Sequence, residues 1–443
     1  MTPRAVITGL GWVTPLGDGL ADTFEALCAG RSGLVAPTRH GGGTPPVGAA
    51  GEVPAALRER LAGADPEAAA SGDPRTLYAA AAARAALADA GLCDAGLPGA
   101  GSGAAARGPA RGARAGVALA SGPGIHRIED LARGLDAQGR LDLPAYARLL
   151  PRHAADSNLR HGAHGPAAFL ARRHGLDGPV LAPVTACAAS GQALGLALRA
   201  VRAGEVDWML AGGADSRVTS IGLCWFALLG AAASAEGPPA EACKPFDRRR
   251  TGVVVGEGAA VLVIESEEHA RARGARIRAE LSGYGASLDA YRATAPCPDG
   301  RGAAQAMARA LQDAGMAAGE VGLVNAHGTG TKRNDPAEVA AIKAVFGAQA
   351  RRLAVPGLKS MLGHLLSASA AVACASSVLS LETGRVPPTA TLHEPDPACD
   401  LDHVARVAQQ RDLRAALVNA FAFGGNNAVL ALRRWDGPAG GRA

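Results

Sequence analysis

Short apolar runs that stop at glycines alternate with longer stretches of helical spacing along nearly the whole chain. Strand-like runs cover 4–11, 116–122, 178–187, 206–215, 276–285, 321–331, 352–364 and 416–432. Helical spacing covers 76–92, 188–205, 300–315, 336–347 and 367–384. This alternation predicts an α/β fold with largely parallel sheets that helices cover on both faces.

The pattern recurs in the second part of the chain, which predicts two similar halves joined near 270–275. We expect a first half at 1–272, a second half at 273–435 and a flexible tail at 436–443. The Gly/Ala/Arg-rich stretch 98–116 is typical of a surface loop.

Composition narrows the class of protein. Apolar residues make up 48% of the chain, so a large core is expected, and the net charge of +5 lacks the basic stripe of a nucleic-acid binder. Eight scattered cysteines without a CxxC pair argue against a zinc site and indicate reduced thiols in the cytoplasm. No apolar run approaches the roughly 20 residues that span a bilayer, and the N-terminus lacks a signal-peptide core.

The sequence gives only weak support for a metal site or a dinucleotide-binding site. His153, His161, His164 and His174 lie in one arginine-rich stretch, but no carboxylate or cysteine spacing accompanies them, so solvated loop residues are favoured over a metal site. The GLGWVT segment from Gly9 lacks the last glycine of a dinucleotide-binding fingerprint.

Four residues at expected strand ends could carry chemistry. Cys187 ends a strand and opens a helix, where free N–H groups lower a thiol's pKa, although its small neighbours alone favour a buried structural thiol. His327, Lys359 and His364 stand in other glycine-flanked loops, and the Gly-Gly turn after Phe423 exposes backbone N–H groups. Together they supply the parts for covalent acyl transfer.

At this point the chain resembles a known family. The segments VTACAAS, KPFDRRRTGVVVGEGAAVLVIE, NAHGTGT, GLKSMLGHLL and NAFAFGGNNA occur in the order and spacing of β-ketoacyl-acyl-carrier-protein synthases of the synthase II type. The chain also resembles the relatives of these synthases in type II polyketide and polyene pathways. The resemblance runs from VITGLG to about Arg434 and implies a thiolase-like fold of five layers, αβαβα.

The resemblance also implies a mechanism. Cys187 would accept an acyl group from an acyl carrier protein, and His327 and His364 would promote decarboxylation of a malonyl thioester. The resulting carbanion would attack the acyl group to give a β-ketoacyl product. Backbone N–H groups of Cys187 and Phe423 would form the oxyanion hole, and Phe423 would also act as a gate.

Supporting roles follow in the same way. Lys359, paired with Glu338 or Asp335, would set the electrostatics around the histidines, and Thr329 and Thr331 would contact pantetheine. No metal and no soluble cofactor is implied. The partners would be acyl carrier protein and a second subunit, either a copy of this chain or a homologue.

Several positions depart from the family pattern. Ala373 stands where the family usually has a glutamate, Ala422 replaces a glycine beside the gate, and GGNN replaces Gly-Gly-Thr-Asn. The 331–335 segment TKRND is closer to polyketide-type synthases. These changes leave acyl chain length and pathway open.

The sequence leaves other interpretations open. Arg248, Arg249 and Arg250, or Arg58 and Arg60, could meet an acidic carrier protein, although solvated charges are the simpler reading. The main alternative is a partner subunit of a heterodimer with little activity alone, against which Cys187 and both histidines count. A degradative thiolase would need a second catalytic cysteine near the C-terminus, where 419–427 has none.

Overall fold

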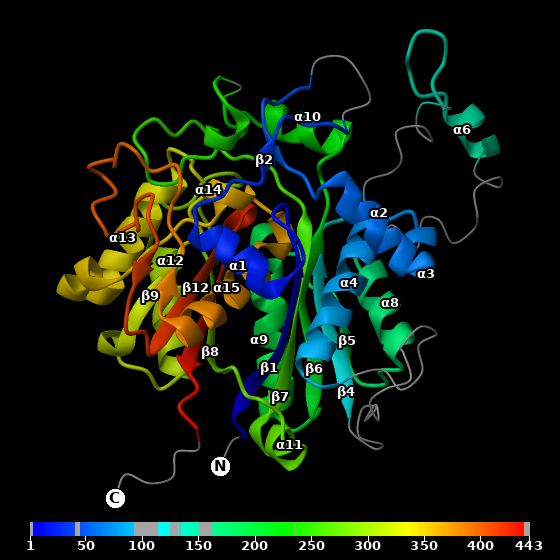
Figure 1. Cartoon of the computed structure of the whole chain (residues 1–443). Coiled ribbons are helices and arrows are strands. Elements are labelled where there is room, and N and C mark those ends of the chain that lie inside the picture. Colours follow the sequence, from blue (N-terminus) through cyan, green and yellow to red (C-terminus); the bar gives the residue numbers. More distant parts are fainter. Residues whose placement is uncertain are drawn as a thin grey trace, which may run out of the picture.

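The computed structural model describes residues 3–39, 45–92, 114–124, 132, 134–149, 162–234 and 236–437. Its centre is a nine-stranded sheet with the order β5-β4-β6-β7-β1-β8-β13-β12-β9 (Figure 1). The strands are β1 (Ala5–Val13), β4 (Ala115–Ser121), β5 (Val180–Leu181), β6 (Trp208–Asp215), β7 (Gly258–Ser266), β8 (Ala279–Leu288), β9 (Val321–Asn325), β12 (Ala415–Phe421) and β13 (Asn426–Arg434).

Different helices cover two parts of this sheet, one containing β4, β6, β7 and β1 and the other containing β8, β13, β12 and β9. Helix α4 (Pro74–Asp89) covers β1 and β7, with α8 (Gly165–His174) beside it against β4. Helices α9 (Ala189–Arg202) and α15 (Ser369–Thr383) contact strands of both parts, and α12 (Arg301–Asp313) covers β8 and β13 with α13 (Asn334–Phe346) against it. In Figure 1, α9 and α15 lie between the two outer helical layers, which confirms the expected αβαβα architecture.

The smaller elements connect these layers. They are α1 (Leu20–Cys28), β2 (Leu34–Val35), β3 (Ala50–Gly51), α2 (Ala55–Ala64), α3 (Pro66–Ala70), α6 (Leu143–Leu149), α10 (Ser220–Leu228), α11 (Glu267–Ala272), α14 (Lys359–Leu362), β10 (Arg385–Val386) and β11 (Gln409–Gln410).

The expectation of largely parallel sheets is wrong. Parallel pairing joins β4 to β5 and β6, and β9 to β12, whereas β6–β7, β7–β1, β1–β8, β8–β13 and β13–β12 are antiparallel. Two features cause the difference. Strand β7 lies in a segment that the helix–strand alternation does not single out, and the Gly-Gly turn after Phe423 folds β13 directly back onto β12.

Two expected strands are also shorter than their apolar runs. In 178–187 the assigned strand β5 covers only Val180 and Leu181, although the Gly178 N–H and the Pro179 oxygen also form hydrogen bonds with β4. Pro183, two residues after Leu181, has no N–H to donate to a ladder. In 352–364 the backbone makes isolated bridges at Ala354, turns into α14 after Pro356 and Gly357, and makes another isolated bridge at His364.

One helix in each half, α4 in the first and α12 in the second, packs closely on a strand through pairs of glycines. A Cβ at Gly9 or Gly11 of β1 would lie 2.1 or 2.0 Å from the carbonyl oxygen of Ala86 or Ala82 in α4. In the second half a Cβ at Gly283 or Gly285 of β8 would lie 2.4 or 2.1 Å from the carbonyl oxygen of Ala310 or Ala306 in α12. This repeated close approach supports the predicted halves, and the boundary at 272/273 stays a prediction. Most of the predicted tail, 438–443, lies outside the described residues.

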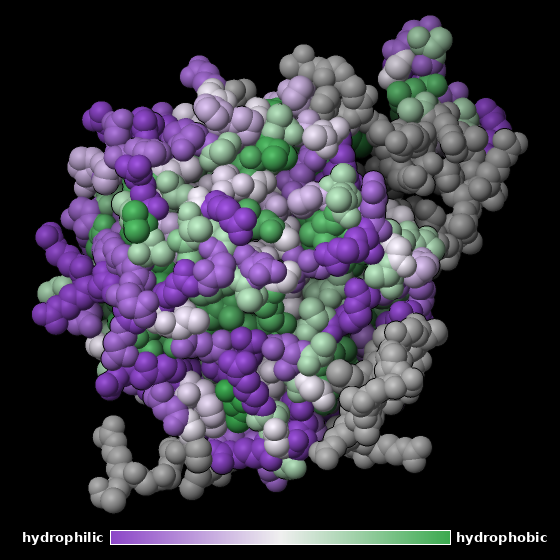
Figure 2. Space-filling view, in the orientation of Figure 1, coloured by the Kyte–Doolittle hydropathy of each residue, from purple (hydrophilic) through white to green (hydrophobic). Residues whose placement is uncertain are grey.

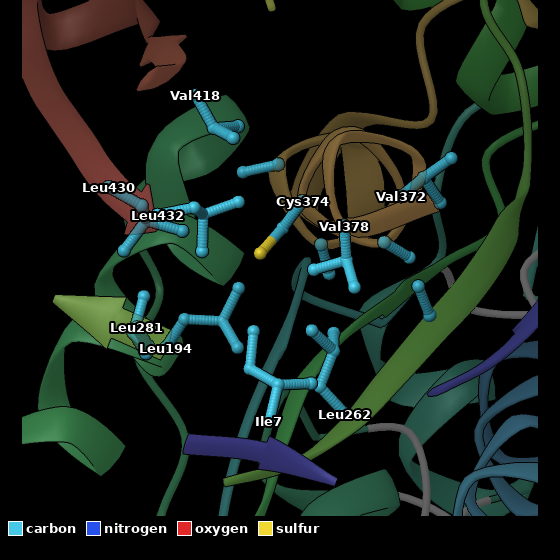
Figure 3. Close-up of a cluster of buried hydrophobic side chains, with 14 of the residues drawn as sticks. Ile7, Leu194, Leu262, Leu281, Val372, Cys374, Val378, Val418, Leu430 and Leu432 are labelled. Atoms are coloured by element: carbon cyan, nitrogen blue, oxygen red, sulfur yellow. The ribbon is translucent and has the colours of Figure 1, made fainter. Parts of the chain in front are cut away.

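The core around α15 contains side chains from both parts of the sheet. Figure 3 shows Cys374 and Val378 of α15 pointing into a cluster with Ile7 and Leu262 on one side and Leu430 and Leu432 on another. The segment Leu366–Thr383 is long and apolar enough to span a membrane, but 83% of it is buried in this core. On the face shown in Figure 2, hydrophilic residues predominate and apolar residues form small separate patches.

Candidate active site

Cys187 lies in a tight turn, Ala186–Ala188, that leads directly into α9. Ala186 has a φ of 48°, a backbone conformation that is strained for a residue with a side chain. Leu366, just before α15, repeats this conformation with a φ of 51°. The turn replaces the predicted strand end and places the thiol at the start of the helix, as the sequence predicts.

Burial raises the pKa of the Cys187 thiol to about 12. The positive charge of Lys359 lowers this pKa, the carboxylate of Asp215 raises it, and hydrogen bonds from the backbone N–H groups of Cys187 and Phe423 lower it. The thiol is therefore neutral near pH 7, and the same two N–H groups are placed to bind an oxyanion that forms beside the sulfur.

His327 and His364 face each other edge to face, with ring centroids 5.3 Å apart. Both are buried, and both line the same cavity as Cys187. Burial, followed by the charge of Lys359, lowers the pKa of both imidazoles well below their usual value. Each ring is therefore neutral at pH 7 and keeps one N–H that can donate a hydrogen bond.

The hydrogen bonds of His364 assign its tautomer. Its Nδ1 accepts the backbone N–H of Leu366 at 3.2 Å and lies 2.8 Å from the hydroxyl of Ser369. An Nδ1 that accepts cannot also carry the proton, so the N–H is at Nε2. For His327, Nδ1 is buried and has no hydrogen-bond partner in the described part of the chain.

The carboxylate of Glu338 fixes the backbone of the His327 loop through hydrogen bonds. It accepts the backbone N–H groups of His327 at 2.7 Å and Gly328 at 2.8 Å, and the side-chain amide of Asn419 at 3.0 Å. Asp335 accepts the backbone N–H of Phe246 at 2.8 Å. Burial raises the pKa of both carboxyl groups.

Lys359 does not form the predicted ion pair. Its ammonium donates to the backbone oxygen of His327, and the described residues include no carboxylate oxygen within 4.0 Å of it. Glu338 acts on Lys359 only at longer range, where its charge opposes the lowering of the Lys359 pKa by burial. The carboxylates are instead used to fix backbone N–H groups.

These residues line a cavity of about 330 Å³. Thr329 and Thr331 lie on its wall with their hydroxyl oxygens 3.0 Å apart, next to the exposed side chains of Lys332 and Arg333. Phe423 also lines the cavity and is 38% exposed. The cavity therefore brings together Cys187, both histidines, both threonines and Phe423, the expected gate, from widely separated parts of the chain.

The departures from the family pattern near Phe423 are compatible with the local backbone conformation. Ala422 has a φ of −127° and a ψ of 155°, which any residue adopts, so alanine is unstrained there. Gly424 and Gly425 have φ values of 83° and 78°, and these are the positions that need glycine.

Sequence reasoning missed several residues of this site. Asp215, at the end of β6, accepts the backbone N–H of Ser367 at 3.1 Å and raises the pKa of Cys187. The strand-end rule that selected His327 would also have selected Asp215. Phe226 and Leu229 form a wall of the cavity, and no local pattern indicates them because they come from the separate helix α10 and its end.

The predicted arginine docking sites are mostly occupied within the chain. Arg248 pairs with Glu394, Arg249 with Asp247, and Arg250 with Asp396. Arg60 pairs with Asp18, whereas Arg58 has a buried Nε without a hydrogen-bond partner in the described chain. Four of the five side chains are therefore already paired with carboxylates of the chain itself.

The histidine-rich stretch is only partly described. His153 and His161 lie outside the described residues, and His164 and His174 stand at the two ends of α8. Within the described ranges no cluster of three or more His, Cys, Asp or Glu could hold a metal.

Comparison with known proteins identifies the family. Residues 2–270 match the family described as beta-ketoacyl synthase, N-terminal domain, and residues 278–393 match beta-ketoacyl synthase, C-terminal domain. The 3-oxoacyl-[acyl-carrier-protein] synthase 2 of Coxiella burnetii is 36% identical over 97% of this chain and 98% of its own length. The protein of the same name from Staphylococcus aureus strain COL is 37% identical, with 98% and 99% covered.

Solved structures agree. A type II polyketide ketosynthase bound to a hexaketide, in complex with its acyl-carrier protein, has a TM-score of 0.83 at 30% identity and covers 98% of this chain and 100% of that one. The ishigamide ketosynthase/chain length factor has a TM-score of 0.81 at 36% identity, with 98% and 100% covered. The chain therefore belongs to the β-ketoacyl synthase family.

Proposed function

We propose that this protein catalyses decarboxylative Claisen condensation between an acyl group on Cys187 and malonyl-acyl carrier protein, giving β-ketoacyl-acyl carrier protein. The observation that carries the proposal is the meeting of Cys187, His327, His364 and the Phe423 N–H at one cavity. The products belong to fatty-acid or type II polyketide chain elongation, in keeping with the names of its relatives.

The first step transfers the acyl group. The sulfur of Cys187 attacks the thioester carbonyl of the acyl carrier protein, and the N–H groups of Cys187 and Phe423 receive the charge that forms on the oxygen. One such donor is worth about 3 kcal/mol in other enzymes. The thiol proton leaves with the pantetheine sulfur, so the thioester is exchanged and no co-reactant is needed.

The second step forms the new carbon–carbon bond. Malonyl thioester bound between His327 and His364 loses CO₂, and its electrons move onto the thioester oxygen as an enolate. The Nε2–H of His364 and the N–H of neutral His327 stabilise that oxygen. The enolate carbon then attacks the acyl carbonyl on Cys187, and the sulfur leaves and regains a proton.

Thr329 and Thr331 are placed to contact the pantetheine arm, since both lie on the cavity wall. The acidic acyl carrier protein would approach the cavity mouth, where Lys332 and Arg333 are exposed and have no ion pair among the described residues. Neither a metal nor a soluble cofactor has a role in these steps.

We further propose that the protein works as a dimer in the cytoplasm. Strand β5 forms one edge of the described sheet; Val180 within it and Val184 just after it are 45% and 51% exposed. The described cysteines are all free thiols, which suits a reducing compartment. The partner is a second copy of the chain or a homologous subunit, as in the ketosynthase/chain length factor structure.

Intact-protein mass spectrometry tests the function. The protein is incubated with acyl carrier protein loaded with saturated and unsaturated acyl groups of several lengths. We expect a mass gain of one acyl group on the wild type and none on Cys187→Ala. Malonyl-acyl carrier protein should then discharge the acyl group as a β-ketoacyl product.

The same experiment distinguishes the alternative, a subunit with little activity alone. No mass gain by the purified chain, followed by acylation when the homologous subunit is added, would favour that role. Acylation of Cys187→Ala at the wild-type rate would contradict the proposed nucleophile.

A further inference from the structure

A separate, much smaller cavity is lined by chain neighbours of the two histidines, Ala326, Gly363 and Leu365. Its volume is about 20 Å³, and its polar lining consists of Asn325 at the end of β9, Lys359 at the start of α14 and Ser369 at the start of α15. Ala373 forms one wall, and the remaining lining residues are apolar. One water molecule needs about 10–15 Å³ of such volume and two to four polar partners.

Asn325 provides an unused acceptor at this cavity. The side chain is 2% exposed, and its amide nitrogen donates to the backbone oxygen of Ala373 and to the hydroxyl of Ser377, both at 3.1 Å. These two bonds fix the orientation of the amide. Its Oδ1 is buried without a hydrogen-bond partner among the described residues, and such an orphan acceptor is costly inside a protein.

Lys359 provides unused donors. Its ammonium has three N–H groups, and the described chain offers one hydrogen-bond acceptor, the backbone oxygen of His327. No carboxylate lies within ion-pair distance in the described ranges. The charged and titratable groups around it are Glu338 and Asp335 of α13, the thiols of Cys187 and Cys243, and the two histidines, none of which lines the small cavity.

Ser369 connects the cavity to the active site. His364 Nδ1 is an acceptor, so the Ser369 hydroxyl donates to it at 2.8 Å. The lone pairs of the Ser369 oxygen then remain free to accept a further hydrogen bond.

We propose that this cavity binds one ordered water, which accepts a hydrogen bond from Lys359 and donates to Asn325 Oδ1 and Ser369 Oγ. The water links the buried ammonium through Ser369 to His364 and so helps to hold the Nε2–H tautomer that faces the large cavity. Asn325 and Ser369 are therefore positioning residues. This role at His364 rests on the proposed condensing function, whereas the water site does not.

Ala373 makes the site testable. Ala373→Val adds two methyl groups to the wall of the cavity and should exclude the water, and Ala408→Val makes the same addition at another half-buried alanine, away from the cavity. We expect kcat of Ala373→Val to fall about tenfold, the size expected when a charged group loses one hydrogen bond. KM for malonyl-acyl carrier protein should stay near the wild-type value, and Ala408→Val should match the wild type.

The pH profile separates positioning from general damage. Losing a hydrogen bond to the charged form of Lys359 favours its neutral form, so the alkaline limb of kcat should move to lower pH in Ala373→Val. Equal profiles for Ala373→Val and Ala408→Val would overturn the role of the water at His364.

A high-resolution crystal structure of the wild type tests the water directly. Density for a water within hydrogen-bond distance of Asn325 Oδ1 and Lys359 Nζ supports the site, and its absence overturns it even if Ala373→Val fails to fold. This result does not depend on catalysis. If the wild type neither accepts an acyl group nor releases CO₂, the proposed function fails while the density still decides the water site.

Discussion

At the scale of single residues, the proposed nucleophile of this protein, Cys187, is a neutral thiol near pH 7. Burial raises the pKa of Cys187 to about 12, and the opposing effects of Lys359 and two backbone N–H groups do not bring it into the physiological range. The strained Ala186 and the start of α9 hold the sulfur at the cavity. The thiol therefore has to lose its proton as it reacts.

This predicts the pH dependence of alkylation. Only the thiolate reacts, and below its pKa the thiolate fraction rises about tenfold per pH unit. We expect the rate of iodoacetamide modification at Cys187, followed by peptide mass spectrometry, to climb through pH 6–9 without a plateau. Cys224 is exposed and serves as an internal comparison. A plateau at Cys187 below pH 8 would show that the site stabilises a thiolate.

At the scale of secondary-structure elements, glycines set the distance between helix and sheet. Gly11 lets β1 approach α4 so closely that a Cβ would lie 2.0 Å from the backbone oxygen of Ala82. Gly285 has the same relation to Ala306 in the second half. A backbone atom cannot rotate away as a side chain can, so the layers would have to separate.

We therefore expect Gly11→Ala to lower the free energy of unfolding by about 2 kcal/mol or more, the cost of overpacking a core. Gly63→Ala is the matched control, because it lies in α2 with no atom within 4 Å of the new Cβ. In a helix the control exchange should stabilise by about 0.5–1 kcal/mol. Urea denaturation measures both, and equal midpoints for the two variants would contradict the packing argument.

At the scale of the whole molecule, β5 leaves one edge of the sheet open among the described strands. An exposed edge with apolar side chains is a site where another chain can pair. Cys187 follows Val184 by three positions, so a partner on this edge would lie close to the proposed nucleophile.

We expect the wild type to sediment as a dimer and Val184→Lys to shift it towards monomer, because the new charge would be buried in the interface. Val407→Lys is the control, since Val407 is 73% exposed and lies far along the chain next to β11. Analytical ultracentrifugation measures both. A monomeric wild type, or a Val184→Lys variant that stays dimeric, would contradict an interface at β5.

The sequence by itself determined the helices of the central layers and the residues that could react, and its resemblance to the β-ketoacyl synthases implied the αβαβα class. Helical spacing and glycine stops are local, so α9 and α15 could be located without knowing their neighbours. The five motifs with Cys187, His327 and His364 likewise stand in the chain independently of how it folds.

Only the tertiary structure decided how these parts pair. Periodicity reports whether a residue is buried, not which strand lies beside it, so the antiparallel partners of β7 and β13 could not be read from spacing. Hydrogen bonding also depends on atoms from distant segments. Lys359 uses the backbone oxygen of His327 instead of the predicted carboxylate, and the small cavity at Ala373 exists because β9, α14 and α15 meet there.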